Sequence, residues 1–235
     1  MSHVTFAYNK GESNVLNDVN IHVKPGEYVA VVGPSGCGKS TLLKLLLGFE
    51  KPRTGKIYYD NRDIDEMDKR ELRKRFGVVL QDGGLIPGSI YDNITITSPL
   101  VKRERVNEVI EEVGLKEDIE AMPMGLHTIV SDGAGTIFGG QAQRILIARA
   151  LVGKPKVIFL DEATSALDNV TQNLVVETLE KIKGTKLVIA HRLSTVRHCD
   201  RIIVMDGGRI IEEGNYDTLM EKKGFFYDLA VRQMS

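Results

Sequence analysis

A glycine-rich stretch, GPSGCGKST at Gly33–Thr41, separates an apolar run from a helical pattern. The run EYVAVV before it is typical of a buried strand, and KSTLLKLLLGF, from Lys39 onward, has the apolar spacing of a helix that Gly48 could end. Glycines at such a junction let the backbone curl so that successive N–H groups point inward. The chain must therefore contain a strand–loop–helix unit with a concave backbone nest at the positive end of a helix.

The spacing of this stretch is GxxxxGK[ST], the phosphate-binding P-loop, in the structural context that the pattern requires. Lys39 can reach the β- and γ-phosphates of a nucleoside triphosphate, and the Ser40 hydroxyl can ligate Mg²⁺. A chance glycine turn is the alternative, but the strand, lysine, serine and helix together argue against it. The residues expected to line the nucleotide site are Gly33, Ser35, Gly36, Cys37, Gly38, Lys39, Ser40 and Thr41.

Strand and helix patterns alternate along most of the chain. We expect strands at 4–8, 19–23, 27–32, 76–82, 154–162 and 185–191, a short strand and turn at 55–64, and a hairpin at 200–214. Helical patterns cover 39–49, 101–113, 135–151, 171–184 and 192–199, and an irregular stretch follows 113. This order predicts an α/β fold around a mainly parallel sheet, with early antiparallel strands and a middle helical block added to it.

Composition narrows the class of protein. The 31 Lys and Arg against 32 Asp and Glu leave a net charge of -1, which argues against a general nucleic-acid binder, so no nucleic-acid partner is expected. No apolar run reaches the length that spans a bilayer, and the N-terminus lacks a signal-peptide layout. With only Cys37 and Cys199, a disulfide framework is not expected and a reducing cytosol is the default.

Two carboxylates and a histidine follow predicted strands. Asp161 is placed to hold Mg²⁺, and Glu162 to polarise an attacking water, although both could be merely solvated strand-end residues. His191 ends the predicted strand 185–191, where it could contact the γ-phosphate and hold Glu162 and the water in place. A lone histidine is more often structural, but the P-loop context favours the catalytic interpretation.

Taken together, these residues resemble the nucleotide-binding domain of an ABC transporter, over essentially the whole chain. GPSGCGKST is similar to its Walker A motif, VIFLDE to Walker B with the catalytic glutamate, SALD with Asp168 to the D-loop, and His191 to the switch histidine. Gln81 resembles the Q-loop glutamine, which implies both a metal-binding and a catalytic role. Tyr8 resembles the aromatic that stacks on adenine, with a core strand residue as the alternative.

The resemblance implies a RecA-like P-loop NTPase core, at about 1–86 and 154–235, an antiparallel β-subdomain and an inserted helical subdomain at about 87–153. It also implies an ATPase that uses ATP and Mg²⁺ at the cytoplasmic face of a membrane. Two such domains, as a homodimer or heterodimer, would enclose two ATP molecules head to tail and drive a transmembrane domain. Two stretches resemble the corresponding segments of exporters more than those of importers: PGSIYDNI and PMGLHTIVSDGAG. The second is similar to the exporter-specific loop, although Asp132 stands where glutamate is usual. We expect an excised domain of a longer exporter, or else a separate subunit.

FGGQ at Phe138–Gln141 replaces the family signature LSGGQ, in which the serine and glycines contact the ATP held by the opposite subunit. Phenylalanine offers neither a hydroxyl nor an N-cap. Gly139, Gly140 and Gln141 keep the expected role, whereas Phe138 should weaken dimerisation and hydrolysis. ATP binding by the monomer should stay near normal.

Three other functions remain open. A soluble ABC ATPase of DNA repair or translation usually carries paired cassettes or long insertions, which are absent here. A P-loop kinase or switch would not need Gln81, FGGQ and His191 in this order. A regulatory module with little turnover is favoured by Phe138. The transported cargo stays open among peptide, lipid and small molecule.

Overall fold

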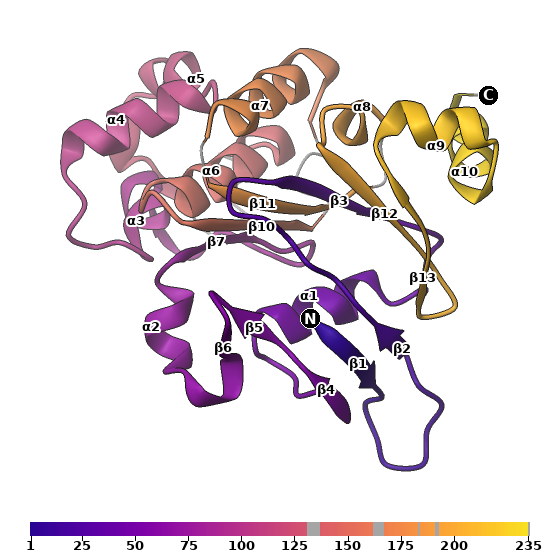
Figure 1. The fold of residues 1–235 in the computed structure, drawn as a ribbon. Coiled ribbons are helices and arrows are strands. Elements are labelled where there is room, and N and C mark those ends of the chain that lie inside the picture. The colour runs from indigo at the N-terminus through magenta and orange to yellow at the C-terminus, as the bar shows by residue number, and fades with distance from the viewer. Residues whose placement is uncertain (131–136, 162–166, 183, 191–192, 235) are drawn as a thin grey trace. The chain divides into compact units, whose positions relative to one another are not determined.

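The computed structural model describes residues 1–130, 137–161, 167–182, 184–190 and 193–234. The chain divides into two compact units, one formed by Met1–Arg73 with Thr185–Ser235 and the other by Lys74–Gly184 (Figure 1). The boundaries predicted for the helical subdomain, 87 and 153, both fall inside the second unit and stay a prediction.

The first unit is centred on β3 (Tyr28–Val32), all of whose residues are buried. β3 pairs in parallel with β11 (Thr185–Ile189) and with β12 (Arg201–Asp206), and β13 (Arg209–Gly214) returns antiparallel to β12. A strand with neighbours at both edges and both faces covered reads as a continuous apolar run, which is what YVAVV is. The predicted strands at 27–32 and 185–191 and the hairpin at 200–214 are therefore confirmed.

A second, antiparallel sheet in this unit has β1 (Ser2–Phe6) between β2 (Leu16–Val19) and β4 (Thr54–Lys56). The strand predicted at 19–23 is wrong, because β2 precedes it and ends at Val19. The apolar residue Ile21 misled the prediction, since it is buried without belonging to a strand. The stretch predicted as a strand and turn forms the small hairpin of β5 (Tyr58–Tyr59) and β6 (Arg62–Asp63).

In the described residues of the first unit there are five α-helices. α1 (Lys39–Leu46) begins inside the glycine-rich stretch, and Gly48 takes a φ of 67° just beyond its end, as a helix stop requires. α2 (Lys69–Arg73), α9 (Tyr216–Lys222) and α10 (Phe225–Met234) were not predicted, although Asn215 caps α9 by accepting from the Thr218 N–H at 2.9 Å. α8 (Leu193–Val196) is shorter than the predicted helix at 192–199.

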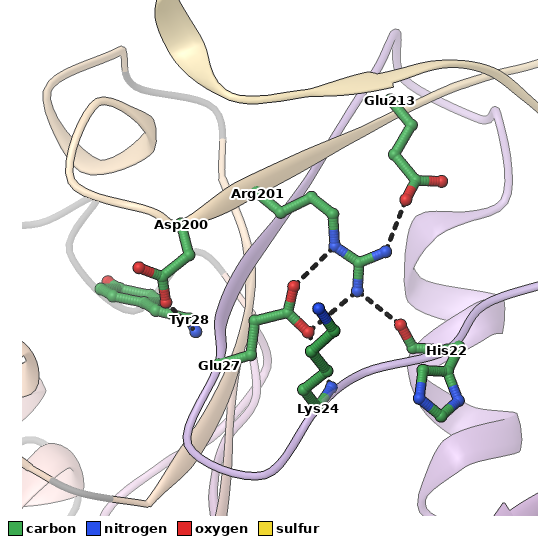
Figure 2. Close-up of polar contacts among 7 residues, drawn as sticks. All are labelled: His22, Lys24, Glu27, Tyr28, Asp200, Arg201 and Glu213. Carbon is green, nitrogen blue, oxygen red and sulfur yellow. Dashed lines mark hydrogen bonds and ion pairs between the residues drawn. The ribbon is translucent and has the colours of Figure 1, made fainter.

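Figure 2 shows a polar cluster that ties together three segments of the first unit. The guanidinium of Arg201, at the start of β12, donates to both carboxylate oxygens of Glu27 at 2.7 and 3.0 Å. It also donates to Glu213 and to the carbonyl oxygen of His22. Glu27 accepts a further bond from the Lys24 N–H at 2.7 Å. The turn before β3 is thereby joined to β12 and β13.

Glu27→Gln should destabilise the protein in a pH-dependent way. Burial raises the pKa of Glu27, but the Lys24 N–H and the Arg201 guanidinium outweigh it and leave the pKa below its ordinary value of 4.5. A lowered pKa in the folded state stabilises the fold above the unfolded-state pKa, and this is lost as the pH falls through the folded-state pKa. Unfolding in urea should show a loss of about 1–3 kcal/mol at pH 7, shrinking below pH 4.5. The exposed Glu221→Gln is the control, and a pH-independent difference would contradict the assignment.

The second unit contains the parallel pair β7 (Phe76–Val79) and β10 (Val157–Asp161), with β8 (Gly88–Ser89) and β9 (Ile129–Val130) as a small antiparallel pair. Its helices are α3 (Ile90–Thr95), α4 (Arg103–Glu112), α5 (Lys116–Glu120), α6 (Gly139–Leu151) and α7 (Asn169–Lys181). α3 and α4 both pack against α6, whose buried residues include Ile145 and Ile147.

The predicted strands and long helices of this unit are confirmed within a few residues at their ends. The described part of the stretch after 113 is less irregular than predicted, because α5 and a 3₁₀ turn at Gly125–His127 lie in it. Among the described residues, no helix is both long and apolar enough to cross a membrane.

Candidate functional site

The glycine-rich loop runs from the end of β3 to the start of α1, as predicted. Two of its glycines are required by their surroundings. Gly33 has a φ of 153°, and a Cβ there would collide with the carbonyl oxygen of Met205. Gly38, which precedes α1, has a φ of 107°, and a Cβ there would lie 2.7 Å from the Leu16 side chain. Side chains are thus excluded from the two ends of the loop, which leaves the backbone itself to line it.

Lys39 is the buried cation of this loop. Its ammonium donates to the carbonyl oxygens of Gly33 at 2.8 Å and Pro34 at 3.0 Å, so the side chain turns back over the loop instead of reaching into water. Cys37 lies beside it, with Sγ 3.9 Å from the ammonium. Burial raises the pKa of the Cys37 thiol even though Lys39 lowers it, so the thiol stays protonated and is a poor nucleophile.

Tyr8 lies next to the loop, just past the end of β1. Its hydroxyl is 3.1 Å from Oγ1 of Thr41, and its ring meets Phe6 edge to face at 5.0 Å. Lys44 of α1 lies over the same ring at 5.7 Å. Tyr8 is 47% exposed, so the alternative of a core strand residue is wrong. One side of the loop therefore carries the solvent-exposed ring of Tyr8, whose hydroxyl is hydrogen-bonded to α1.

The other predicted site residues of the first unit are the hydroxyl-bearing residues and Gly36 of the loop, and one histidine. Ser40 is exposed at the start of α1, whereas Thr41 is buried. Ser35 and Gly36 are exposed at the tip of the loop. His191 lies outside the described residues, so its role stays a prediction.

The second unit holds the remaining predicted residues. Asp161 is the last residue of β10 and is buried, and Glu162, the next along, lies outside the described residues. Asp168 caps α7 by accepting from the Val170 and Thr171 N–H groups, both at 3.0 Å. These bonds, that from the Thr171 N–H first, hold the pKa of Asp168 below its ordinary range. The described part of the D-loop stretch therefore has a clear structural role as a helix cap.

Gln81 is exposed two residues beyond β7, and a polar clamp fixes the segment that follows it. The carboxamide of the buried Asn93 accepts from the Ile86 N–H and donates to the Ile86 carbonyl, each at 2.9 Å. Arg149 of α6 donates to the carbonyl oxygens of Asn93 at 2.7 Å and Gly84 at 3.1 Å. Sequence reasoning missed this clamp; its signal was Arg149, the arginine that interrupts the apolar run ILIARAL of α6.

Phe138 and the glycine pair open α6. Phe138 has the extended backbone of an N-cap residue, with φ −82° and ψ 159°, and its ring is 71% exposed. Gly139 and Gly140 form the first turn of the helix, and a Cβ at Gly139 would meet none of the described atoms within 4 Å. Backbone N–H groups at the positive end of a 13-residue helix are thus open to an anion.

Comparison with known proteins identifies the family of this chain. A family model described as "ABC transporter" matches residues 16–165. The chain is 44% identical over 230 residues to the toxin RTX-III translocation ATP-binding protein of Actinobacillus pleuropneumoniae. It is 43% identical over 227 residues to the α-hemolysin translocation ATP-binding protein HlyB of Escherichia coli O157:H7. These matches cover 97% and 96% of this chain but only 32% of either relative, so the chain spans about a third of their length.

A solved structure extends the likeness to three dimensions. The structure of a bacterial Atm1-family ABC exporter with ATP bound superimposes with a TM-score of 0.95 at 35% identity. The match covers 100% of this chain and 41% of that one. Because the family model matches more than half of the residues and the fold agrees throughout, this chain belongs to the ABC transporter family and has the P-loop NTPase fold of its ATPase domain.

Proposed function

We propose that the chain is the ATP-driven motor domain of an exporter, which binds and hydrolyses ATP and passes the resulting movement to a transmembrane domain at the cytoplasmic face of the membrane. The observation that carries the proposal is the P-loop, in which Lys39 lies buried over a backbone nest between β3 and α1. When a polyphosphate binds, this ammonium would leave the two carbonyl oxygens and donate to phosphate oxygens instead. Hydrogen bonds between an ammonium and a phosphate are stronger than those to a carbonyl.

In the proposed nucleotide site, different residues bind the base and the phosphates of ATP. Tyr8 stacks on the base, because its exposed ring is held beside α1 by the bond to Thr41. The N–H groups of the loop and of the start of α1 surround the phosphates, and Lys39 bridges the β- and γ-phosphates. Removing any one of these contacts weakens ATP binding to this chain alone.

The oxygen donors proposed for Mg²⁺ are the Ser40 hydroxyl, the Gln81 carbonyl and the Asp161 carboxylate. No group of three His, Cys, Asp or Glu residues in the described part of the chain could hold a metal by itself. This fits Mg²⁺, which prefers oxygen ligands and is usually bound through one or two carboxylates with substrate phosphates and water. Mg²⁺ would supply positive charge against the phosphates during transfer.

Hydrolysis needs a base and a group that orients the attacking water. Glu162 polarises the water, Gln81 helps to place it, and His191 contacts the γ-phosphate. Gly139 and Gly140 of a second copy, or of a related domain, cover the γ-phosphate from outside. In this arrangement Phe138 never touches the ATP held by its own chain.

The names of the relatives support a proposal for the cargo. Two relatives are named for translocation of an RTX toxin and of α-hemolysin, which favours a polypeptide cargo for the transporter to which this domain belongs.

The second candidate function is a regulatory module with little turnover, which the exposed ring of Phe138 favours.

Turnover separates the two functions. Phosphate release by this chain, with ATP and Mg²⁺, should exceed that of Glu162→Gln by at least about tenfold, because removal of a general base typically costs a factor of 10² or more. ATP affinity, measured by calorimetry, should be the same in both proteins. Equal rates would favour the regulatory module, and failure of both proteins to bind ATP would reject both functions.

A further inference from the structure

The first turn of α6 lacks the side-chain cap that most helices have at this position. Phe138 occupies the N-cap with extended backbone geometry, but a phenyl ring cannot accept a hydrogen bond from the N–H groups of the turn. Glycines at the first two helical positions add conformational freedom to the unfolded turn. A helix start with this sequence should fray unless another group holds it.

Gln141 supplies half of a capping arrangement. Its carboxamide oxygen accepts from the Phe138 N–H at 3.1 Å, which closes the turn from the helix side. Its carboxamide nitrogen donates to Oδ1 of Asp118, on α5, at 2.7 Å. Both ends of the carboxamide are thus used inside the same unit.

Arg144, one turn further along α6, shares the same carboxylate. Its guanidinium lies 2.9 Å from Oδ2 of Asp118 and also donates to the carbonyl oxygen of Gly114. The exposed fractions of the two side chains are 13% for Arg144 and 27% for Asp118, so this pair is partly shielded from water and stronger than an ordinary surface pair.

We propose that Asp118 is a positioning residue: it holds Gln141 and Arg144 against α5 and so stabilises the first turn of α6, which has no capping hydroxyl. The inference rests on the proposed function, in which the N–H groups of Gly139 and Gly140 must face the nucleotide of a second copy. It also gives Gln141 a role in shaping this turn in place of the predicted contact with ATP.

Hydrogen exchange measures the turn without requiring activity. In Asp118→Ala, the hydrogen-bonded amides of this turn, those of Phe138 and of residues 142–144, should exchange roughly tenfold faster than in the unchanged chain, which is the effect of losing a helix cap or a charged hydrogen bond. Asp118→Asn keeps an acceptor for Gln141 but loses the charge that faces Arg144, and should restore part of the protection. Glu117→Ala, on the exposed side of the same short helix, is the matched control. Equal exchange in Asp118→Ala and Glu117→Ala would overturn the proposal.

A double-mutant cycle with Phe138→Ser separates positioning from general stability. Serine caps the turn by itself, so Asp118→Ala should accelerate exchange about two- to threefold in that background, against roughly tenfold with Phe138 present. If the effects of the two changes on the exchange rates were fully additive, Asp118 and a capping serine would act independently. That result would overturn the proposal that Asp118 compensates for the missing cap.

Two further measurements separate this proposal from the proposed function. ATP affinity of the monomer should be equal with and without Asp118, whereas ATP-driven association of the chain should fall several-fold in Asp118→Ala. A loss of ATP affinity as large as the loss of association would overturn the positioning role. If no variant associates with ATP while the exchange pattern holds, the proposed function fails and the role of Asp118 in the turn stands.

Discussion

Phe138→Ser should raise the steady-state ATPase rate of this chain by roughly ten- to a hundredfold. The backbone at this position already has N-cap geometry, so serine can cap α6 without a change of the main chain. Its hydroxyl also adds a hydrogen bond to a charged phosphate, worth about 1.5–3 kcal/mol, which corresponds to this range of rates. Phosphate release at several protein concentrations measures the effect, because association of two chains should become easier as well.

Phe138→Ala is the control that separates two causes. Alanine removes the ring, which is 71% exposed, but adds no hydroxyl. A rate close to that of the serine variant would mean that collision of the ring limits the unchanged chain, whereas a rate close to that of phenylalanine would assign the effect to the missing donor. An ATPase rate that is the same in all three proteins would contradict the proposed role of this segment.

Lys39→Ala should weaken ATP binding by about two orders of magnitude, which corresponds to the loss of one or two hydrogen bonds between charged groups. The lysine is buried over the loop, where its ammonium bonds to two carbonyl oxygens. Without it those oxygens would face the phosphates uncompensated, so the loss includes repulsion as well as a missing attraction. Calorimetric titration with ATP and Mg²⁺ measures the change.

Lys51→Ala provides the control for net charge. Lys51 is exposed, and its ion pair with Asp65, at 3.3 Å, lies in water, where such pairs contribute little. Its removal should leave ATP affinity unchanged within about twofold, which is the size of effect expected for a screened surface charge. Equal losses in the two variants would mean that the triphosphate is held by diffuse charge and not by the P-loop.

The parts of the fold with strong local signals could be predicted from the sequence. β3 is buried on all sides, so its five apolar residues are informative by themselves, and the glycines after it are needed where a Cβ would strike Met205 or Leu16. The hairpin of β12 and β13 turns at Gly207 and Gly208, both with positive φ. Here local propensity and tertiary structure agree.

Other elements depend on contacts that no local pattern reveals. Ile21 is apolar and buried but belongs to no strand, so periodicity alone misplaced β2. Gln141 donates to Asp118 and Arg149 donates to Asn93, and both acceptors lie far away along the chain. Such pairs form only when separate helices pack, and a sequence without its fold cannot distinguish them from solvated polar residues.

The central claim is that two copies of this domain form a dimer that encloses two ATP molecules. The most direct test of this dimer is sedimentation velocity on a chain that carries both Glu162→Gln and Phe138→Ser. Glu162→Gln slows hydrolysis so that bound ATP persists, and Phe138→Ser restores the donor that faces the opposite subunit. We predict a monomer without nucleotide and a dimer with ATP, containing one ATP per chain, and a monomer again when Lys39→Ala is added. A monomer at every ATP concentration, or a dimer that survives Lys39→Ala, would contradict it.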